Sequence, residues 1–201
     1  MNKIICIERQ FASGGTDIGR IVSERLGIPF YDKEIINQIA KENGMSEEMI
    51  NSYDEKPTNS FLYSLSLGAF SYGGAHNGIP EMPLSDKIYV AQNDIIKGIA
   101  DKGPCVIIGR CANSILKDNY DLLTVFVHAS TEYKIERLMR LKGYDRNAAV
   151  AELRKTDKKR SSYNNYYADV KWGDVKSYDL CLNSELGFEK CADIICSALD
   201  K

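Results

Sequence analysis

Short runs of apolar residues are separated along this chain by longer stretches in which apolar and polar residues recur with a helical period. The runs are continuous and several are rich in β-branched residues, a pattern typical of strands that are buried on both faces of a sheet. Such strands, separated by helical stretches, favour an α/β sheet covered on both faces. The runs lie at residues 4–7, 105–108, 122–127 and 180–182, with a shorter candidate at 28–31.

The stretches between these runs carry the 3.6-residue period of amphipathic helices. Ser85 and Ser130 are predicted N-cap residues, because each stands just before acidic residues at the start of a helical stretch. The alternation of elements predicts a three-layer α/β core. The apolar positions that share a helix face are Ile18, Ile21, Val22 and Leu26 in one stretch, and Ile88, Ala91, Ile95, Ile96 and Ile99 in another.

Two segments interrupt this alternation. Residues 68–84, GAFSYGGAHNGIPEMPL, combine several glycines with two prolines, which predicts a mobile loop. We expect one excursion from the core at about 45–84 and a second, basic one at about 142–172. The remainder, residues 1–44, 85–141 and 173–201, forms the core of a single domain.

The composition argues against several functional classes. A net charge of -2 and a pI near 5.8 make a broad nucleic-acid surface unexpected, since such surfaces carry a basic excess. The apolar run at 4–7 is shorter than a signal sequence or a membrane span, so we expect a cytoplasmic protein without membrane partners. The six cysteines form no CxxC pair and are predicted to be reduced core thiols rather than zinc ligands.

The first predicted strand leads through SGGTDIG into a helix, and this turn is a candidate anion site. Backbone N–H groups at residues 13–16 are free at such a helix start, where the helix dipole also favours negative charge. The Thr16 hydroxyl is a candidate Mg²⁺ ligand. The GxxxxGK[ST] pattern of phosphate-binding loops is absent, because Gly15 stands in place of the lysine. The alternative is a glycine turn capped by Ser13 or Thr16, which Asp17 fits because a carboxylate there repels phosphate.

Arginines at two predicted strand ends are candidates to replace the missing lysine. Arg110 follows the run at 105–108 after one glycine, and a guanidinium there can hold a phosphate through two hydrogen bonds. Its alternative is a surface arginine at the start of a loop. Arg9 stands at the end of the first strand and faces the glycine turn, so it is the candidate substitute for the lysine.

A basic helical segment lies between the last two predicted strands. Arg154, Asp157 and Arg160 recur every three residues and share a helix face, and Arg137 lies on the helix before them. Taken alone, the segment is equally consistent with a solvated face whose charges pair with each other. Beside a turn that can bind phosphate, it suits a lid that closes over the phosphates during transfer.

Four blocks of this sequence occur in the order found in one known family. They are ICIERQFASGGTDIGRIVSERLGIPFYDKEII, CVIIGRCANSIL, RLMRLKGYDRNAAVAELRKTDKKRSSYNNYY and WGDVKSYDLCLNS. Together they resemble the cytidylate kinase-like family, a branch of the nucleoside monophosphate kinases. The resemblance implies a P-loop α/β fold with a parallel five-stranded sheet, an acceptor-binding excursion and a lid. It also implies ATP with Mg²⁺ as phosphoryl donor and CMP or dCMP as acceptor.

The resemblance further implies roles for individual residues, although Arg9 and the two residues after it depart from the family's pattern at the front of the loop. The residues expected at the donor phosphates are Arg9, Ser13, Gly14, Gly15 and Thr16. Those expected at the acceptor are Asp32, Arg110, Asp157 and Arg160. Those expected to follow the charge on the transferring group are Arg137 and Arg154.

Two other functions stay open at this point. The missing lysine and Asp17 favour a regulator that binds a nucleotide without catalysis. A kinase for another small acceptor is the second possibility, in which case the glycine-rich segment at 68–84 determines specificity.

Overall fold

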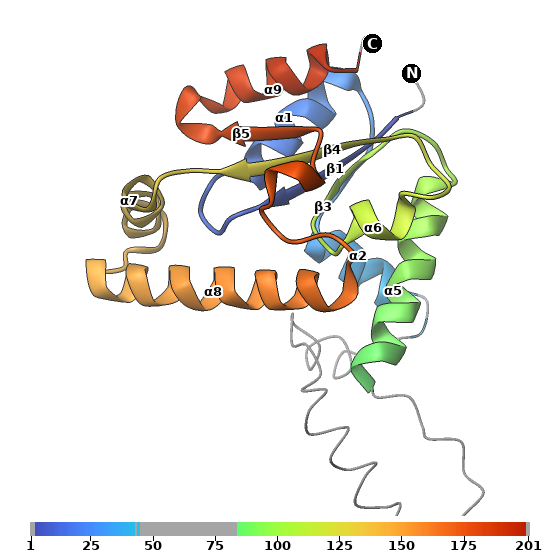
Figure 1. Ribbon diagram of the computed structural model, residues 1–201, viewed down its shortest axis with the longest axis horizontal. Helices are drawn as coiled ribbons and strands as arrows, with labels where there is room; N and C mark the ends of the chain where they lie inside the picture. Colours follow the sequence, from blue (N-terminus) through green and yellow to red (C-terminus); the bar gives the residue numbers. More distant parts are fainter. Residues whose placement is uncertain (1–2, 43, 45–83, 200–201) are drawn as a thin grey trace, which may run out of the picture.

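The computed structural model describes residues 3–42, 44 and 84–199, and its centre is a sheet of five parallel strands in the order β2-β3-β1-β4-β5. Each of the five predicted runs forms one of these strands, so the predicted three-layer α/β fold with a parallel five-stranded sheet is confirmed (Figure 1). The strands are β1 (Ile4–Arg9), β2 (Phe30–Tyr31), β3 (Val106–Ile108), β4 (Leu122–His128) and β5 (Leu180–Asn183).

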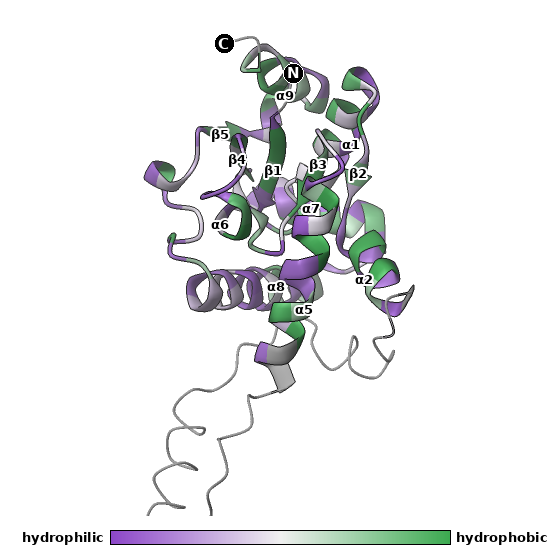
Figure 2. Ribbon diagram, turned by 90° about the vertical axis from the view of Figure 1, so that its right-hand side faces the viewer, coloured by the Kyte–Doolittle hydropathy of each residue, from purple (hydrophilic) through white to green (hydrophobic). Residues whose placement is uncertain are grey.

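Helices cover both faces of the sheet. On one face, α1 and α9 pack against the sheet, and on the other α2, α5 and α6 do so (Figures 1 and 2). Beyond the carboxyl ends of the strands, α7 leads into the long helix α8, which is more hydrophilic than the strands in Figure 2. The helices are α1 (Gly15–Leu26), α2 (Lys33–Glu42), α5 (Leu84–Ala100), α6 (Ala112–Leu116), α7 (Thr131–Lys142), α8 (Arg146–Tyr167) and α9 (Phe188–Ser197), with short 3-10 turns η1 (Val175–Ser177) and η2 (Ser184–Leu186).

The central strand β1 explains why the apolar runs are continuous. Ile5 and Ile7 lie in the core beneath α1 and α9, whereas Ile4 and Cys6 lie in the core on the opposite face. All four side chains are at most 2% exposed. Because both faces are covered, a polar residue at any of these positions would lose its hydration without gaining a hydrogen-bond partner. Each buried isoleucine instead contributes about 1.5–3 kcal/mol to the stability of the fold.

Close approach of α1 to the sheet depends on Gly19. A Cβ atom at this position would lie 2.6 Å from Cδ1 of Ile108 and 3.2 Å from Cδ1 of Ile7. The helix therefore packs closer to the sheet than a larger residue at position 19 would allow. This packing brings the N-terminus of α1 to the carboxyl end of β1.

The segment predicted as a lid consists mainly of α8, which packs against α7 through a small core of Ile135, Leu138, Ala149 and Leu153. Phe11, from the loop after β1, packs against this core. The hydroxyl of Ser130 accepts a hydrogen bond from Tyr133 N–H, so its prediction as the N-cap of α7 is confirmed. The corresponding prediction for Ser85 is wrong, because α5 already begins at Leu84.

The excursion predicted at 45–84, with its glycine-rich loop, lies outside the described residues except for Leu84. All six cysteines lie in the described part of the chain and are free thiols, and four of them are buried. Among the helices that the structure describes, none combines the length and apolarity required to cross a bilayer.

Candidate functional site

Backbone strain marks one edge of the sheet, where the loops after β1 and β3 meet. Within the described part of the chain, Ala12 (φ 59°), Arg110 (φ 61°) and Cys111 (φ 55°) are the non-glycine residues with positive φ. Each such residue costs about 1–3 kcal/mol and persists where the surrounding structure requires it, often at a functional site. The carboxyl edge of a parallel sheet is also where α/β proteins bind ligands.

The loop between β1 and α1 is held in shape by Ser13. This residue is fully buried, and its hydroxyl donates to the backbone oxygen of Gln10 (2.9 Å) and is 3.2 Å from that of Val127. The N-cap of α1 is Gly14 (φ 84°), with no side-chain hydrogen bond at the cap. Neither Ser13 nor Thr16 therefore caps the helix, and the first-turn N–H groups keep their capacity to bind an anion. The amide of Ser13 is directed into the loop, 3.4 Å from Gln10 O.

Asp17, which was expected to repel a phosphate, forms an ion pair with Arg137. Nη2 of Arg137 lies 2.8 Å from Oδ2 of Asp17, and the guanidinium also lies 4.9 Å from the ring centroid of Phe188. That ring occupies the space where a side chain at Gly14 would stand. The pairing neutralises the carboxylate at the mouth of α1, and stacking on the ring holds the arginine there.

The short 3-10 turn η2, just before Phe188, is tied to the start of α7. Backbone N–H of Ser130 donates to a carboxylate oxygen of Glu185 at 2.7 Å. This hydrogen bond lowers the pKa of Glu185 below its ordinary value, so the carboxylate is ionised at neutral pH.

Arg9 occupies the room that Gly15 leaves. A Cβ atom at position 15 would lie 2.6 Å from Cβ and 3.1 Å from Cγ of Arg9. The guanidinium continues to the turn after β3, where Nη1 fills the space of a side chain at Gly109. Arg9 therefore extends from the start of α1 to the residue before Arg110, and the two glycines are the positions that allow it to do so.

Two cavities meet at the loop. The first, of about 160 Å³, is lined by the loop, the start of α1 and the inner side of α7, and carries four basic residues against one acid. The second, of about 400 Å³, lies between the loop, the start of α2 and α8, and its charges are nearly balanced. The charged residues of the first are Arg9, Asp17, Arg137, Lys142 and Arg160, and those of the second are Arg9, Asp32, Lys33, Glu34, Glu152, Lys159 and Arg160.

Arg9, Thr16 and Arg160 line both cavities. Nη1 of Arg160 donates to the backbone oxygen of Arg9 at 3.2 Å, and its guanidinium lies 5.5 Å from the ring centroid of Phe11, which also lines both cavities. A group bound in the first cavity and a group bound in the second would therefore meet beside the same two guanidinium groups and the same hydroxyl.

Asp32 lies on the wall of the second cavity and also begins α2. Its Oδ1 accepts a hydrogen bond from Ile35 N–H at 3.1 Å, and its Oδ2 lies 3.6 Å from Nη2 of Arg20. This side chain is 12% exposed, so it caps the helix while one side remains accessible from the cavity.

Arg110 is buried, at 7% exposure, so the alternative that it is a surface arginine is wrong. Within the described part of the chain, its Nε and Nη1 atoms meet no hydrogen-bond acceptor. Buried guanidinium groups are expensive to leave unpaired, so such atoms indicate a site for an anion or for water. Arg110 does not line either of the two cavities.

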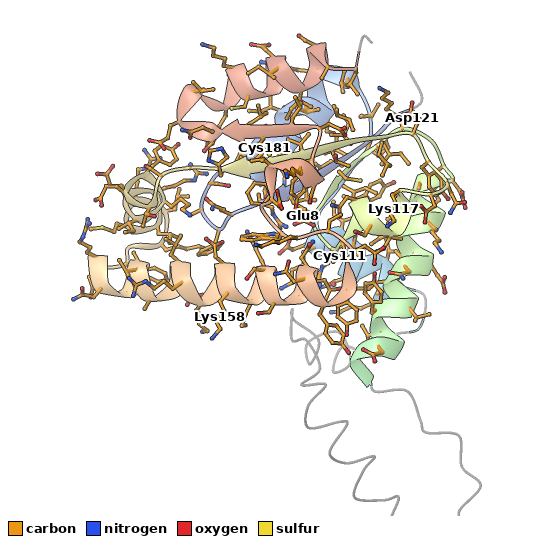
Figure 3. All side chains as sticks on the ribbon, viewed as in Figure 1. Glu8, Cys111, Lys117, Asp121, Lys158 and Cys181 are labelled. Atoms are coloured by element: carbon orange, nitrogen blue, oxygen red, sulfur yellow. The ribbon has the colours of Figure 1, made fainter. Side chains whose placement is uncertain are left out.

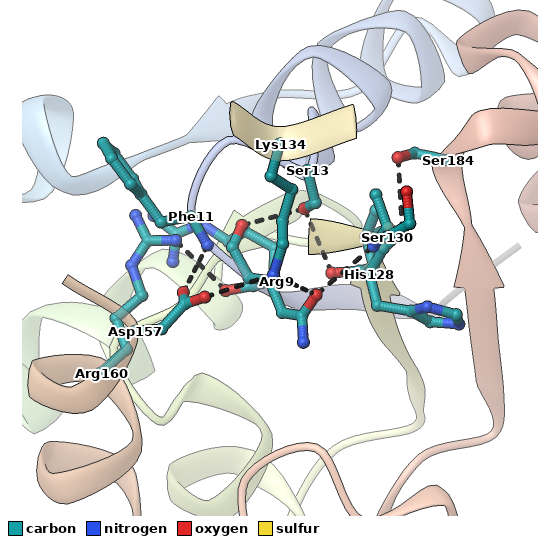
Figure 4. Close-up of polar contacts among 12 residues, drawn as sticks. Arg9, Phe11, Ser13, His128, Ser130, Lys134, Asp157, Arg160 and Ser184 are labelled. Carbon is teal, nitrogen blue, oxygen red and sulfur yellow. Dashed lines mark hydrogen bonds and ion pairs between the residues drawn. The ribbon is translucent and has the colours of Figure 1, made fainter. Parts of the chain in front are cut away.

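Asp157 and Arg154 line neither of the two cavities. Oδ1 of Asp157 accepts a hydrogen bond from Phe11 N–H at 2.6 Å, and the residue lines neither cavity (Figure 4). Arg154 is exposed and also lies outside both. Lys134, which was not predicted as a site residue, is buried beside Asp157. The sequence does contain a signal for the burial of Lys134. This lysine stands four residues before the apolar Leu138, and this spacing places both on the same face of their helix.

Comparison with known proteins places this chain in a family. The model of the cytidylate kinase-like family matches residues 4–186. A crystal structure of an uncharacterized protein from Eubacterium ventriosum has 27% sequence identity and a TM-score of 0.75, with 100% of this chain and 99% of that chain covered. A search of curated proteins found no match.

Two kinases share the fold at lower identity. Shikimate kinase from Bacteroides thetaiotaomicron has 13% identity and a TM-score of 0.58, with 100% of both chains covered. A gluconokinase from Sinorhizobium meliloti has 14% identity and a TM-score of 0.54, with 99% of this chain and 92% of that chain covered. The match of the family model over most of the sequence, together with this fold, shows that the chain belongs to the cytidylate kinase-like family.

Proposed function

We propose that this protein transfers the terminal phosphoryl group of ATP to a nucleoside monophosphate, with CMP or dCMP as the acceptor. The observation that carries the proposal is the meeting of two cavities at Arg9, Thr16 and Arg160, at the start of α1. Phosphoryl transfer requires two ligands aligned end to end with their charge neutralised, and this arrangement provides both conditions.

The first cavity fits the donor. Its basic excess and the uncapped start of α1 suit a polyphosphate. Arg9 takes the place of the absent lysine, because its guanidinium lies at the junction where the transferring group would pass. A bound Mg²⁺ ion would neutralise charge on the phosphate oxygens, and the Thr16 hydroxyl is the candidate protein ligand for it. Arg137 keeps Asp17 paired and so keeps that carboxylate from opposing the donor.

The second cavity fits the acceptor. Arg160 and Arg9 stand at its inner end, where an acceptor phosphate would point at the donor. Lys33 and Lys159 add positive charge on its walls, and the buried Asp32 offers a hydrogen-bond acceptor to a sugar hydroxyl or an amino group. Membership of the family supports CMP or dCMP as the first acceptors to test.

A coupled ADP-release assay with CMP, dCMP, UMP and AMP tests the proposal. Arg9→Ala and Arg160→Ala are each expected to lower kcat by about 10³, because a guanidinium that stabilises the transferring group is lost. Lys158→Ala is the matched control, since this lysine lies on the side of α8 turned away from the sheet (Figure 3). Turnover of none of these nucleotides by the wild-type protein, or unchanged turnover in both arginine variants, would contradict the proposal.

A kinase for another small acceptor is a second candidate, favoured by the carboxylates of the second cavity. Asp32, Glu34 and Glu152 nearly balance its basic residues, a charge pattern that also suits an acceptor with hydroxyl groups and no phosphate. Adding shikimate and gluconate to the acceptor panel separates the two candidates. ATP binding without turnover of any acceptor would instead support a nucleotide-binding regulator.

A further inference from the structure

Lys134 is a buried cation that faces neither cavity. Its side chain is 6% exposed, and burying an ammonium group is costly unless hydrogen bonds and an opposite charge compensate. A lysine at such a position therefore requires partners that the surrounding structure holds in place.

Its partners belong to the front of the phosphate loop and to α8. Nζ of Lys134 donates to Oε1 of Gln10 at 2.9 Å and lies 3.5 Å from Oδ2 of Asp157. The other oxygen of Asp157 accepts the N–H of Phe11 at 2.6 Å (Figure 4). Oε1 of Gln10 also lies 3.3 Å from the backbone nitrogen of Ala129, at the end of β4.

These contacts hold loop residues that line a cavity, although Lys134 and Asp157 themselves line neither cavity. The loop residues are Gln10 and Phe11, which line the first cavity. The same two loop residues directly follow Arg9, whose backbone oxygen is held by Arg160. The position of the Arg9 guanidinium therefore depends on how firmly the chain after it is held.

We infer that Lys134 and Asp157 are positioning residues that fix the front of the phosphate loop, and through it Arg9, for the binding of ATP. The inference rests on the proposed function. It assigns Asp157 to the donor side of the reaction, in contrast to the acceptor contact that the family resemblance implies. The Asp157 carboxylate accepts the hydrogen bond of Phe11 N–H, and the buried ammonium of Lys134 compensates the charge of that carboxylate. Together they hold the loop in shape without a lysine at position 15.

Steady-state kinetics separates the two assignments of Asp157. For Asp157→Ala we expect the KM for ATP to rise at least tenfold, with the KM for the acceptor unchanged within twofold. Asp157→Asn keeps an oxygen for Phe11 N–H and should fall between the wild type and Asp157→Ala. Lys158→Ala, one residue away on the exposed side of α8, should match the wild type. A raised KM for the acceptor with an unchanged KM for ATP would overturn the inference.

A double variant tests whether the two charges act as a pair. Lys134→Met alone leaves Asp157 unpaired, and Asp157→Asn alone leaves a buried cation, whereas the combination removes both charges. If the two residues acted independently, the fold-losses in kcat/KM for ATP of the two single variants would multiply. We expect kcat/KM for ATP in the double variant to be at least fivefold higher than that multiplied value. Strictly multiplicative effects would contradict a shared role.

Amide hydrogen exchange at Phe11, followed by NMR, gives a readout that does not depend on activity, and its wild-type arm does not depend on any variant. The inference predicts slow exchange in the ligand-free wild type and exchange at least tenfold faster in Asp157→Ala. Fast exchange in the wild type overturns it. Because this measurement is made without substrates, absence of turnover with every acceptor would refute the proposed function and leave the positioning role to be judged by exchange alone.

Discussion

Restoring the lysine that phosphate-binding loops normally carry is expected to damage this protein. Gly15→Lys places a Cβ atom 2.6 Å from Cβ and 3.1 Å from Cγ of Arg9, and 3.2 Å from Cβ of Val127. Real side chains do not approach so closely, so the loop or the strand must shift. Overpacking of this kind costs about 1–3 kcal/mol.

The contact between position 15 and Arg9 can also be tested by stability alone, with the smaller substitution Gly15→Ala. Gly→Ala at a position with ordinary helical dihedrals usually stabilises a protein by about 0.4–1 kcal/mol. Gly15 has no positive φ and begins α1, yet the contact with Arg9 should reverse that sign. We therefore expect Gly15→Ala to destabilise the fold by about 1–3 kcal/mol in urea unfolding.

A second substitution should restore the stability and activity that Gly15→Lys loses. Removing the Arg9 side chain vacates the space, so Arg9→Gly combined with Gly15→Lys is expected to be more stable and more active than Gly15→Lys alone. The assays are urea unfolding and ADP release with CMP. If Gly15→Lys alone raises both stability and activity, Arg9 does not occupy the place of the lysine, and the account of the loop is wrong.

Three further predictions concern the surroundings of the loop. Phe188→Ala removes the ring beneath the Arg137 guanidinium and beside Gly14, and should raise the KM for ATP without changing the KM for the acceptor in steady-state assays; an unchanged KM for ATP would count against this support. Gly19→Ala should lower the free energy of unfolding by about 1–3 kcal/mol in urea, because its methyl group meets Ile108 at 2.6 Å, and a stabilised variant would contradict the packing described. Burial raises the pKa of Cys105 to about 11, so its thiolate is scarce at pH 8 and Ellman's reagent should label it in urea but not in the native protein, whereas rapid native labelling of Cys105 would show that the start of β3 opens.

The sequence predicted the fold well because its signals are local. A strand buried on both faces must be apolar throughout, as in the run from Ile4 to Ile7, and a helix packed on a sheet must repeat its apolar residues with the helical period. Both patterns can be read without knowing the partner. The start of α5 was misjudged by a residue or so, because Ser85 resembles a cap wherever it stands near a helix start.

The site was harder to predict because its contacts join distant segments. Nothing near Asp157 shows that its partner is the N–H of Phe11, 146 residues away, or that Lys134 contacts its other carboxylate oxygen. A surface residue was the alternative interpretation of Arg110, and its burial follows only from the packing around the turn after β3. The relation of Arg9 to Gly15 could be predicted, because the sequence has a glycine in place of the lysine and an arginine six residues before it.

The central claim is that main-chain N–H groups at the start of α1, aided by the guanidinium of Arg9, bind the phosphates of ATP without a lysine. Calorimetric titration of MgATP into the wild type, Arg9→Ala and Lys158→Ala tests it most directly. Loss of a charge-assisted hydrogen bond of about 1.5–3 kcal/mol predicts binding about 10- to 150-fold weaker in Arg9→Ala and unchanged in Lys158→Ala. Equal affinity of Arg9→Ala and the wild type for MgATP, or no binding by the wild type, would contradict it.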